Sequence, residues 1–239
     1  MSDVKSAMVL AAGLGTRMRP LTDAVPKPLV PLAGKPLLDQ VLDRLASVGV
    51  ERTVVNVHFK ADQIESHLAA RSDPEIVISD ERDVLLDTGC GVVNALQKLG
   101  DTPFFIHNSD SVWIEGGTPC LEQMVQMWNP DMMDVLLLLA PCATTLGYEG
   151  QGDFDMDADG VVSRPPAGTQ VPFVFTGVSL AHPNLFVGAP EGKFSLNVLW
   201  DRAIAKGRAY GLRHEGIWMH VGTPEAVKEA EECIAREQG

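Results

Sequence analysis

The sequence lacks an apolar run long enough to cross a lipid bilayer. Its longest apolar stretch, residues 132–141, is interrupted by Asp134, whereas a membrane-spanning helix needs about 20 apolar residues. The N-terminal segment MSDVKSAMVLAAG also lacks a basic leader followed by an apolar region and a cleavage site. We therefore expect a cytoplasmic protein without a membrane partner.

Cysteine is scarce, and its spacing matches no common cysteine motif. The four cysteines, Cys90, Cys120, Cys142 and Cys233, lie far apart and form no C-x-x-C pair. This spacing argues against both a zinc site and a disulfide framework. We expect reduced thiols.

Positive charge is also in short supply. The chain has 19 Lys and Arg against 32 Asp and Glu, a formal net charge of −13, which disfavours binding to nucleic acid or to an anionic membrane. A phosphate ligand would therefore need a local cluster of cations. Residues 11–38 contain such a cluster, comprising Arg17, Arg19, Lys27 and Lys35.

The first half of the sequence alternates between strand and helix patterns. Strands are predicted at 6–12, 52–57, 75–79 and 103–107, and helices at 37–48, 61–71 and 88–99. Such alternation predicts a doubly wound, mostly parallel Rossmann-like α/β sheet with helices on both faces. At 239 residues a single domain is expected.

The second half has a different pattern. We predict helices at 119–128, 196–205 and 224–236, strands at 133–140, 173–181 and 217–221, and a mobile glycine-rich loop at 144–153. Residues 154–162 contain DADG and predict a small β-hairpin that turns at 158–160.

The first predicted strand runs into a loop with two glycines, Gly13 and Gly15. A dinucleotide fingerprint needs a third glycine where Met18 stands, and the P-loop signature is absent, so a nicotinamide site is improbable. Two interpretations remain, a structural turn or a ligand site at the carboxyl end of a parallel strand. The segment Pro26-Lys27-Pro28 favours the ligand site, because the two prolines hold the lysine on a stiff backbone.

Several motifs together resemble the signature of the sugar-1-phosphate nucleotidyltransferases. These are LAAGLGTR at 10–17, PLT at 20–22, PKPLVPLAGKP at 26–36, VNVH at 55–58, LDTGCG at 86–91, NSD at 108–110, FTG at 175–177 and WMHVGT at 218–223. They extend over nearly the whole chain. Within that family the sequence most resembles the small N-acetylmuramate α-1-phosphate uridylyltransferases of bacterial cell-wall recycling.

The resemblance implies transfer of a nucleotidyl group from a nucleoside triphosphate to a sugar 1-phosphate, with release of pyrophosphate. It assigns Arg17 to the β- and γ-phosphates, Lys27 to the α-phosphate and the sugar phosphate, and Asp110 to a Mg²⁺ ion. The implied nucleotide-binding residues are Leu10, Ala11, Ala12, Gly13, Gly15, Thr16, Arg17, Asp87, Gly89, Gly91 and Asn108.

Four positions depart from the family's pattern. Family members commonly have a glutamate and a Gly-Gly pair at the start of the helix predicted at 88–99, whereas this chain has Asp87 and places Cys90 between Gly89 and Gly91, a difference that bears on base selectivity. His220 stands where the family typically has a second metal-binding aspartate; a histidine ligand is more compatible with Mn²⁺ than an all-oxygen site would be. Arg164 stands where related enzymes often carry the lysine of a Glu-Lys-Pro segment.

For the sugar phosphate, the resemblance implies Arg164, Thr176 and Gly177, with Asn197 and Lys193 as weaker candidates. His58 and His107 lie near predicted strand ends and either line the pocket or serve the structure, whereas His67, His182 and His214 are expected at the surface. The nucleotide-binding half is expected at about 1–115 and the sugar-binding half at about 116–239.

Alternatives remain open at this point. The substrates of related enzymes include mannose 1-phosphate with GTP and glucose 1-phosphate with dTTP or CTP, and no single residue excludes them. A nucleotide- or sugar-sensing module without catalysis is the alternative from another class. The sequence leaves the oligomeric state open. It contains no C-terminal hexapeptide repeat of the kind found in the bifunctional acetylglucosamine enzyme.

Overall fold

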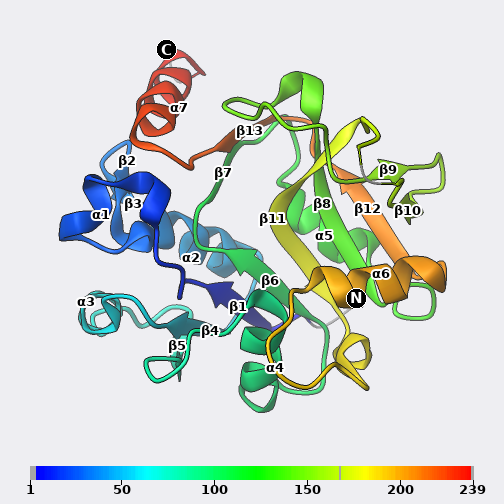
Figure 1. The fold of residues 1–239 in the computed structure, drawn as a ribbon, viewed down its shortest axis with the longest axis horizontal. Coiled ribbons are helices and arrows are strands. Elements are labelled where there is room, and N and C mark those ends of the chain that lie inside the picture. Colours follow the sequence, from blue (N-terminus) through cyan, green and yellow to red (C-terminus); the bar gives the residue numbers. More distant parts are fainter. Residues whose placement is uncertain (1–3, 167, 238–239) are drawn as a thin grey trace.

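The computed structural model describes residues 4–166 and 168–237. Its centre is a seven-stranded sheet in the order β12-β8-β11-β6-β1-β4-β5 (Figure 1). The strands are β1 Ser6–Leu10, β4 Arg52–Val57, β5 Glu75–Asp80, β6 Phe104–Asn108, β8 Val135–Pro141, β11 Phe173–Ala181 and β12 Ala209–Arg213. Both halves of the chain thus contribute strands to one sheet.

The sheet is mostly parallel, which confirms the predicted fold class. β1 pairs in parallel with β4 and β6, β4 with β5, and β8 with β12, whereas β11 runs antiparallel to both β6 and β8. The parallel strands therefore end at a common edge, where an open α/β sheet binds its ligands.

Helices cover both faces of the sheet because successive strand residues point to opposite sides. In β1, Ala7 and Val9 pack into the core under α2, α3 and α5, while Met8 packs into the core under α4 and α6. The helices are α2 Leu37–Ser47, α3 Ala61–Leu68, α4 Thr88–Leu99, α5 Cys120–Met127 and α6 Asn197–Ala205.

Smaller elements surround the edge of the sheet. They are α1 Leu21–Ala24, the β2 Pro31–Leu32 and β3 Lys35–Pro36 hairpin, the β9 Asp155–Met156 and β10 Val162–Ser163 hairpin, the antiparallel ribbon of β7 Ser111–Ile114 and β13 Ile217–His220, and α7 Pro224–Glu237. Figure 1 shows α7 at the top beside β2. A third core cluster joins α7 to the β7–β13 ribbon.

Many element bounds agree with the sequence prediction, including β4, β11 and α4. The small β9–β10 hairpin is also present. The prediction missed β7 and β12. β12 contains Gly211, where a Cβ would lie 2.7 Å from the Leu139 Cδ1 and Met156 Sδ atoms, so the glycine lets these side chains pack onto the strand.

Candidate active site

Lys27 is held where the two prolines leave the backbone little freedom. Pro26 adopts φ −65° before the short 3₁₀ turn Lys27–Leu29, in which the Leu29 N–H donates to the Pro26 carbonyl over 2.9 Å. The Lys27 side chain is 13% exposed, and its ammonium forms an ion pair with the Asp110 carboxylate. Asp110 lies in the two-residue turn between β6 and β7. Two residues 83 positions apart in the sequence thus meet at the edge of the sheet.

Arg17 and His220 complete this charged group. Arg17, Asp110 and His220 line one cavity of about 250 Å³. Burial lowers the pKa of His220, the positive charges of Arg17 and Lys27 lower it further, and Asp110 acts in the opposite direction. These influences favour the neutral imidazole, the form that binds metal ions.

The glycine loop is tied to the lysine segment through Gly15. Gly15 has φ +63°, and a Cβ there would lie 3.0 Å from Thr22 Cγ2 and 3.1 Å from Lys27 Cβ. The buried Thr22 hydroxyl donates to the Gly15 carbonyl over 2.9 Å. The glycine loop at 10–17 and the PLT segment at 20–22 therefore form one packed unit, which lies against Lys27.

A second cavity, of about 300 Å³, opens beside this unit and is lined by most of the predicted nucleotide-binding residues. The predicted residues found there are Leu10, Ala11, Ala12, Gly13, Gly15, Asp87 and Asn108, together with Lys27 and Asp110. Sequence reasoning missed Asn56, Leu85 and Leu86, which also line this cavity. Asn56 lies within the VNVH motif, so a signal for it was present.

Four residues of the predicted nucleotide set do not line that cavity. Arg17 lines the neighbouring cavity of Asp110 and His220, and Thr16 is exposed. Gly89 lies against Phe194, where a Cβ would approach the ring to 2.3 Å. A Cβ at Gly91 would lie 3.1 Å from the Glu81 carboxylate and 3.2 Å from the Asn56 amide. The two glycines thus allow close packing within the protein at the start of α4.

A third cavity, of about 240 Å³, contains the predicted sugar-phosphate residues Arg164, Gly177 and Asn197. Arg164 forms an ion pair with Asp201 and donates to the Asn197 side-chain oxygen, each over 2.8 Å. Its guanidinium carbon lies 4.4 Å from the centroid of the Phe154 ring.

The same cavity has an aromatic wall and a carboxylate that sequence reasoning missed. The rings of Phe175 and Trp200 meet edge to face, with centroids 4.7 Å apart. Asp153 accepts a hydrogen bond from the Phe175 N–H over 2.9 Å and lines both this cavity and that of Arg17.

A bulge in β11 joins the cavities. The pairing of β11 with β8 shifts register between Phe175 and Ser179. There Gly177 has φ +91°, and a Cβ would lie 2.1 Å from Ser111 Oγ. Thr176 is buried and its hydroxyl donates to the Leu138 carbonyl over 2.9 Å, so it is turned away from the predicted sugar site.

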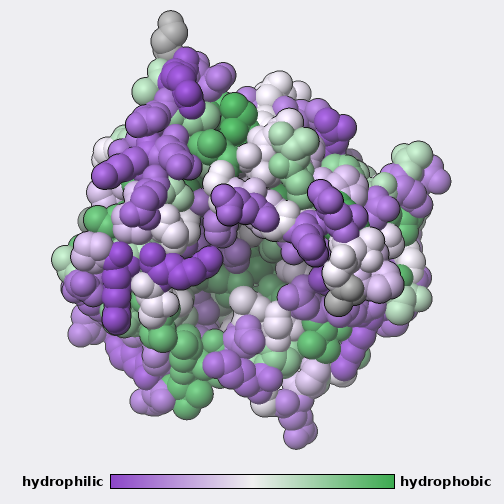
Figure 2. Space-filling model, turned by 45° about the horizontal axis from the view of Figure 1, so that its top comes forward, coloured by the Kyte–Doolittle hydropathy of each residue, from purple (hydrophilic) through white to green (hydrophobic). Residues whose placement is uncertain are grey.

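Asn108, at the end of β6, lines all three cavities. They form a continuous depression at the carboxyl edge of the sheet, and Figure 2 shows the hollow near the middle of this face, rimmed by hydrophilic residues.

The histidines near the strand ends are structural. His107 is fully buried, donates from Nδ1 to the Asn108 carbonyl over 2.7 Å and stacks on Trp113. Burial lowers its pKa to about 4, and the nearby Arg44 charge acts in the same direction. His58 Nδ1 donates to the Glu81 carbonyl over 2.7 Å. The expectation that His214 lies at the surface is wrong, since it is 2% exposed.

Comparison with known proteins identifies this arrangement. Residues 6–148 match the family described as nucleotidyl transferase. The chain belongs to this family. The predicted sugar-1-phosphate nucleotidyltransferase is thereby confirmed, and transferases of this family commonly use a divalent metal ion.

Two relatives match along almost the whole chain. The N-acetylmuramate alpha-1-phosphate uridylyltransferase of Caulobacter vibrioides is 49% identical over 235 residues, covering 97% of each chain. The enzyme of the same name from Neisseria meningitidis serogroup B is 34% identical over 228 residues, covering 94% of this chain and 96% of that one.

Solved structures support the fold. The crystal structure of an apo UDP-glucose pyrophosphorylase superimposes with a TM-score of 0.79 at 16% identity, covering 99% of this chain and 100% of that one. Within the described residues, no helix is long and apolar enough to cross a membrane.

Proposed function

We propose that this nucleotidyltransferase transfers the uridylyl group of UTP to N-acetylmuramic acid α-1-phosphate, giving UDP-N-acetylmuramic acid and pyrophosphate. The observation that carries the chemistry is the convergence of Lys27, Asp110, Arg17 and His220 between the nucleotide and sugar cavities. The choice of base and sugar rests on the identity to the two uridylyltransferases.

In the proposed reaction, an oxygen of the sugar phosphate attacks the α-phosphorus in line. A bond forms between these two atoms, the bond to the bridging oxygen of the β-phosphate breaks, and pyrophosphate leaves. The attacking phosphate is already ionised at neutral pH, so alignment and charge neutralisation suffice without a general base. We assign the attacking and α-phosphates to Lys27, and the leaving pyrophosphate to Arg17.

The nucleotide would occupy the 300 Å³ cavity, with its base and ribose against the backbone of residues 10–13. The sugar would occupy the 240 Å³ cavity, with its apolar face on Phe175 and Trp200 and its charged groups near Arg164 and Asn197. This assignment keeps a nucleotide-binding half at about 1–115 and a sugar-binding half at about 116–239, with Asn108 at their junction.

The donor set at Asp110 fits a divalent cation. A carboxylate oxygen suits Mg²⁺, which completes its shell with substrate phosphate oxygens and water, and the neutral His220 ring adds a nitrogen that also tolerates Mn²⁺. We propose Mg²⁺ as the usual ion, supplying neutralisation of phosphate charge. The free cysteines and the requirement for a nucleoside triphosphate are consistent with a cytoplasmic enzyme.

Pyrophosphate release with a panel of substrates tests the proposal. Each of UTP, GTP, dTTP and CTP is paired with the 1-phosphates of N-acetylmuramic acid, N-acetylglucosamine, glucose and mannose, with Mg²⁺ and with Mn²⁺. The expected result is the highest kcat/KM for UTP with N-acetylmuramic acid α-1-phosphate. A preference for mannose 1-phosphate with GTP, or for glucose 1-phosphate with dTTP or CTP, would overturn the substrate assignment. Binding without turnover would indicate a sensor.

A further inference from the structure

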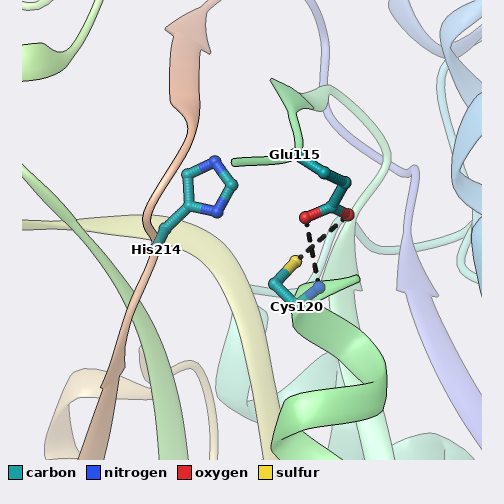
Figure 3. A group of neighbouring side chains, drawn as sticks. All are labelled: Glu115, Cys120 and His214. Atoms are coloured by element: carbon teal, nitrogen blue, oxygen red, sulfur yellow. Dashed lines mark hydrogen bonds between the residues drawn. The ribbon is translucent and has the colours of Figure 1, made fainter. Parts of the chain in front are cut away.

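A group of three potential metal ligands lies behind the active site. Glu115 directly follows β7, Cys120 is the first residue of α5, and His214 lies between β12 and β13. One ligand atom from each residue lies within 4.8 Å of the other two. Figure 3 shows the Glu115 carboxylate facing the Cys120 sulfur and one edge of the His214 ring turned toward both.

The group is buried and mixed in chemistry. Cys120 and His214 are each 2% exposed, and Glu115 is half-buried. Thiolate, imidazole and carboxylate are the donors that Zn²⁺ takes in proteins, commonly with a fourth position open to water. Mg²⁺, which prefers an all-oxygen shell, gains nothing from the sulfur. We propose that Glu115, Cys120 and His214 form a Zn²⁺ site separate from the catalytic centre.

The surroundings hold the ligands in place. The Glu115 carboxylate accepts hydrogen bonds from the Trp113 indole over 2.6 Å and from the Cys120 N–H over 3.1 Å. The backbone N–H of His214 donates to the Leu139 carbonyl over 2.7 Å. Figure 3 shows His214 Nδ1 on the side of Glu115 and Cys120, whereas Nε2, which is buried without a hydrogen-bond partner within the described residues, lies on the opposite edge of the ring. Such outer contacts orient metal ligands and fix their geometry.

Arg44 places a positive charge beside the three ligands. Its guanidinium carbon lies 4.0 Å from the Trp113 ring centroid, and its charge interacts with Glu115 and Cys120. A metal ion binds cysteine as the thiolate, so binding at this site would displace the Cys120 proton. The S–H bond then breaks, a sulfur–metal bond forms and the proton leaves to solvent. Binding of the divalent ion with loss of this proton adds a net charge of +1 to the site instead of +2. Beside the Arg44 cation, this favours an ion that binds thiolate.

The position of the site indicates a structural role. In the β7–β13 ribbon, Ser111 pairs with His220 at the active-site end, and Ile114 pairs with Ile217 at the other end. Glu115 follows the far end, about 13 Å along the strand from Ser111 at roughly 3.3 Å per residue. Zinc would fasten this far end and so keep the ribbon that carries His220 aligned with Asp110.

The test uses the full chain stripped of metal and then loaded with Zn²⁺, or with Co²⁺ as a spectroscopic probe, in excess Mg²⁺. We expect one equivalent of Zn²⁺ to remain after gel filtration, a thiolate-to-cobalt charge-transfer band, and a higher Tm on loading. Cys120→Ser and His214→Gln should lose all three responses.

Two control variants distinguish this site from a second thiol and from the catalytic metal. Cys233→Ser removes another buried thiol, on α7, and Asp110→Asn removes the catalytic carboxylate; both should retain the zinc and the cobalt band. The proposal is overturned if wild type retains no zinc, if Cys120→Ser and His214→Gln keep the band, or if only Asp110→Asn loses the ion. Should one ligand variant fail to fold, wild-type stoichiometry and the other variant decide. None of these readouts depends on transferase activity, so the site and the proposed function can fail independently.

Discussion

The shape of the nucleotide cavity should depend on the order of hydrogen-bond donors and acceptors in one buried pair, Asn56 and Glu81. The Ala11 N–H donates to Asn56 Oδ1 over 2.7 Å, Asn56 Nδ2 donates to Glu81 Oε1 over 2.8 Å, and the Leu86 N–H donates to Glu81 Oε2 over 3.3 Å. Asn56 and Glu81 are each 4% exposed. Because Ala11 and Leu86 line the cavity, the pair links two of its walls.

A single substitution at either residue disrupts this arrangement of donors and acceptors. Glu81→Gln introduces a donor where both oxygens now accept, so in either amide orientation one N–H group faces another. Asn56→Asp leaves Ala11 satisfied but turns a second carboxylate toward Glu81. A buried polar group without its partner costs about 1–3 kcal/mol. We expect each variant to lose stability by about that amount, and the KM for UTP to rise about tenfold, equivalent to roughly 1.4 kcal/mol.

The double variant Asn56→Asp/Glu81→Gln should recover. The new carboxylate at position 56 accepts from the Ala11 N–H and from the new amide at position 81, whose oxygen then accepts from the Leu86 N–H. Every group is satisfied and the net charge equals that of wild type. The two changes should therefore couple favourably, within the range of about 0.5–3 kcal/mol found for contacting residues.

Urea unfolding measures stability, and pyrophosphate release measures KM and kcat for the nucleotide. A positioning role predicts that the single variants raise KM more than they lower kcat, and that the double variant restores KM. Additive losses in the double variant would refute the assigned hydrogen-bond order. Stability losses with an unchanged KM would show that the pair is structural and does not shape the cavity.

Three further changes address the other parts of the site. Lys27→Met should lower kcat about 100- to 1,000-fold in the pyrophosphate assay, as expected for loss of one preorganised charge, whereas Lys35→Met, whose lysine pairs with Asp43 at the surface, should stay near wild type. Gly177→Ala should lower the urea-unfolding free energy by more than Gly34→Ala, because both add a side chain at positive φ but only Gly177 has an atom within 4 Å of the new Cβ. His107 has a folded-state pKa of about 4 against about 6.5 unfolded, so its contribution is complete above pH 6.5 and is lost as pH falls from 6.5 toward 4. The free energy of unfolding should therefore fall by about 2 kcal/mol between pH 7.5 and pH 5 because of His107. In His107→Gln the urea midpoint should fall less over this range than in wild type. An equal fall in both proteins would contradict the lowered pKa of His107.

Periodic patterns predicted most of the sheet and helices because burial of one face leaves a repeating signal in the sequence. β7 escaped prediction because it is four residues long and follows Asp110 directly. The burial of His214 was not predicted because it depends on packing against Trp113, about a hundred positions earlier in the sequence. The two rings meet edge to face with centroids 6.1 Å apart. A single residue carries no period, so its environment is set by packing alone.

In the candidate site, too, local motifs predicted some residues, whereas others depend on contacts between distant parts of the sequence. Motif resemblance suggested Arg17, Lys27, Asp110 and His220, and the structure brings them to one depression. Asn56 and Glu81 form a contact across 25 positions that no local pattern records. A glycine in a motif signals close approach but not what approaches. Gly89 was assigned to a ligand, yet it gives room to Phe194.

Cys90 was expected to affect base selectivity, but its contacts indicate an effect on the sugar cavity. Its sulfur accepts from the Phe194 N–H over 3.1 Å and lies 3.5 Å from the Phe194 carbonyl. Residues 195 and 196, which follow directly, line the sugar cavity, whereas Cys90 does not line the nucleotide cavity. Cys90→Ala should therefore loosen residues 194–196 and raise the KM for the sugar phosphate severalfold, while the ranking of UTP over the other nucleotides stays the same. Steady-state kinetics with each substrate varied in turn separate the two effects. A changed nucleotide ranking with an unaltered sugar KM would show that the start of α4 selects the base after all.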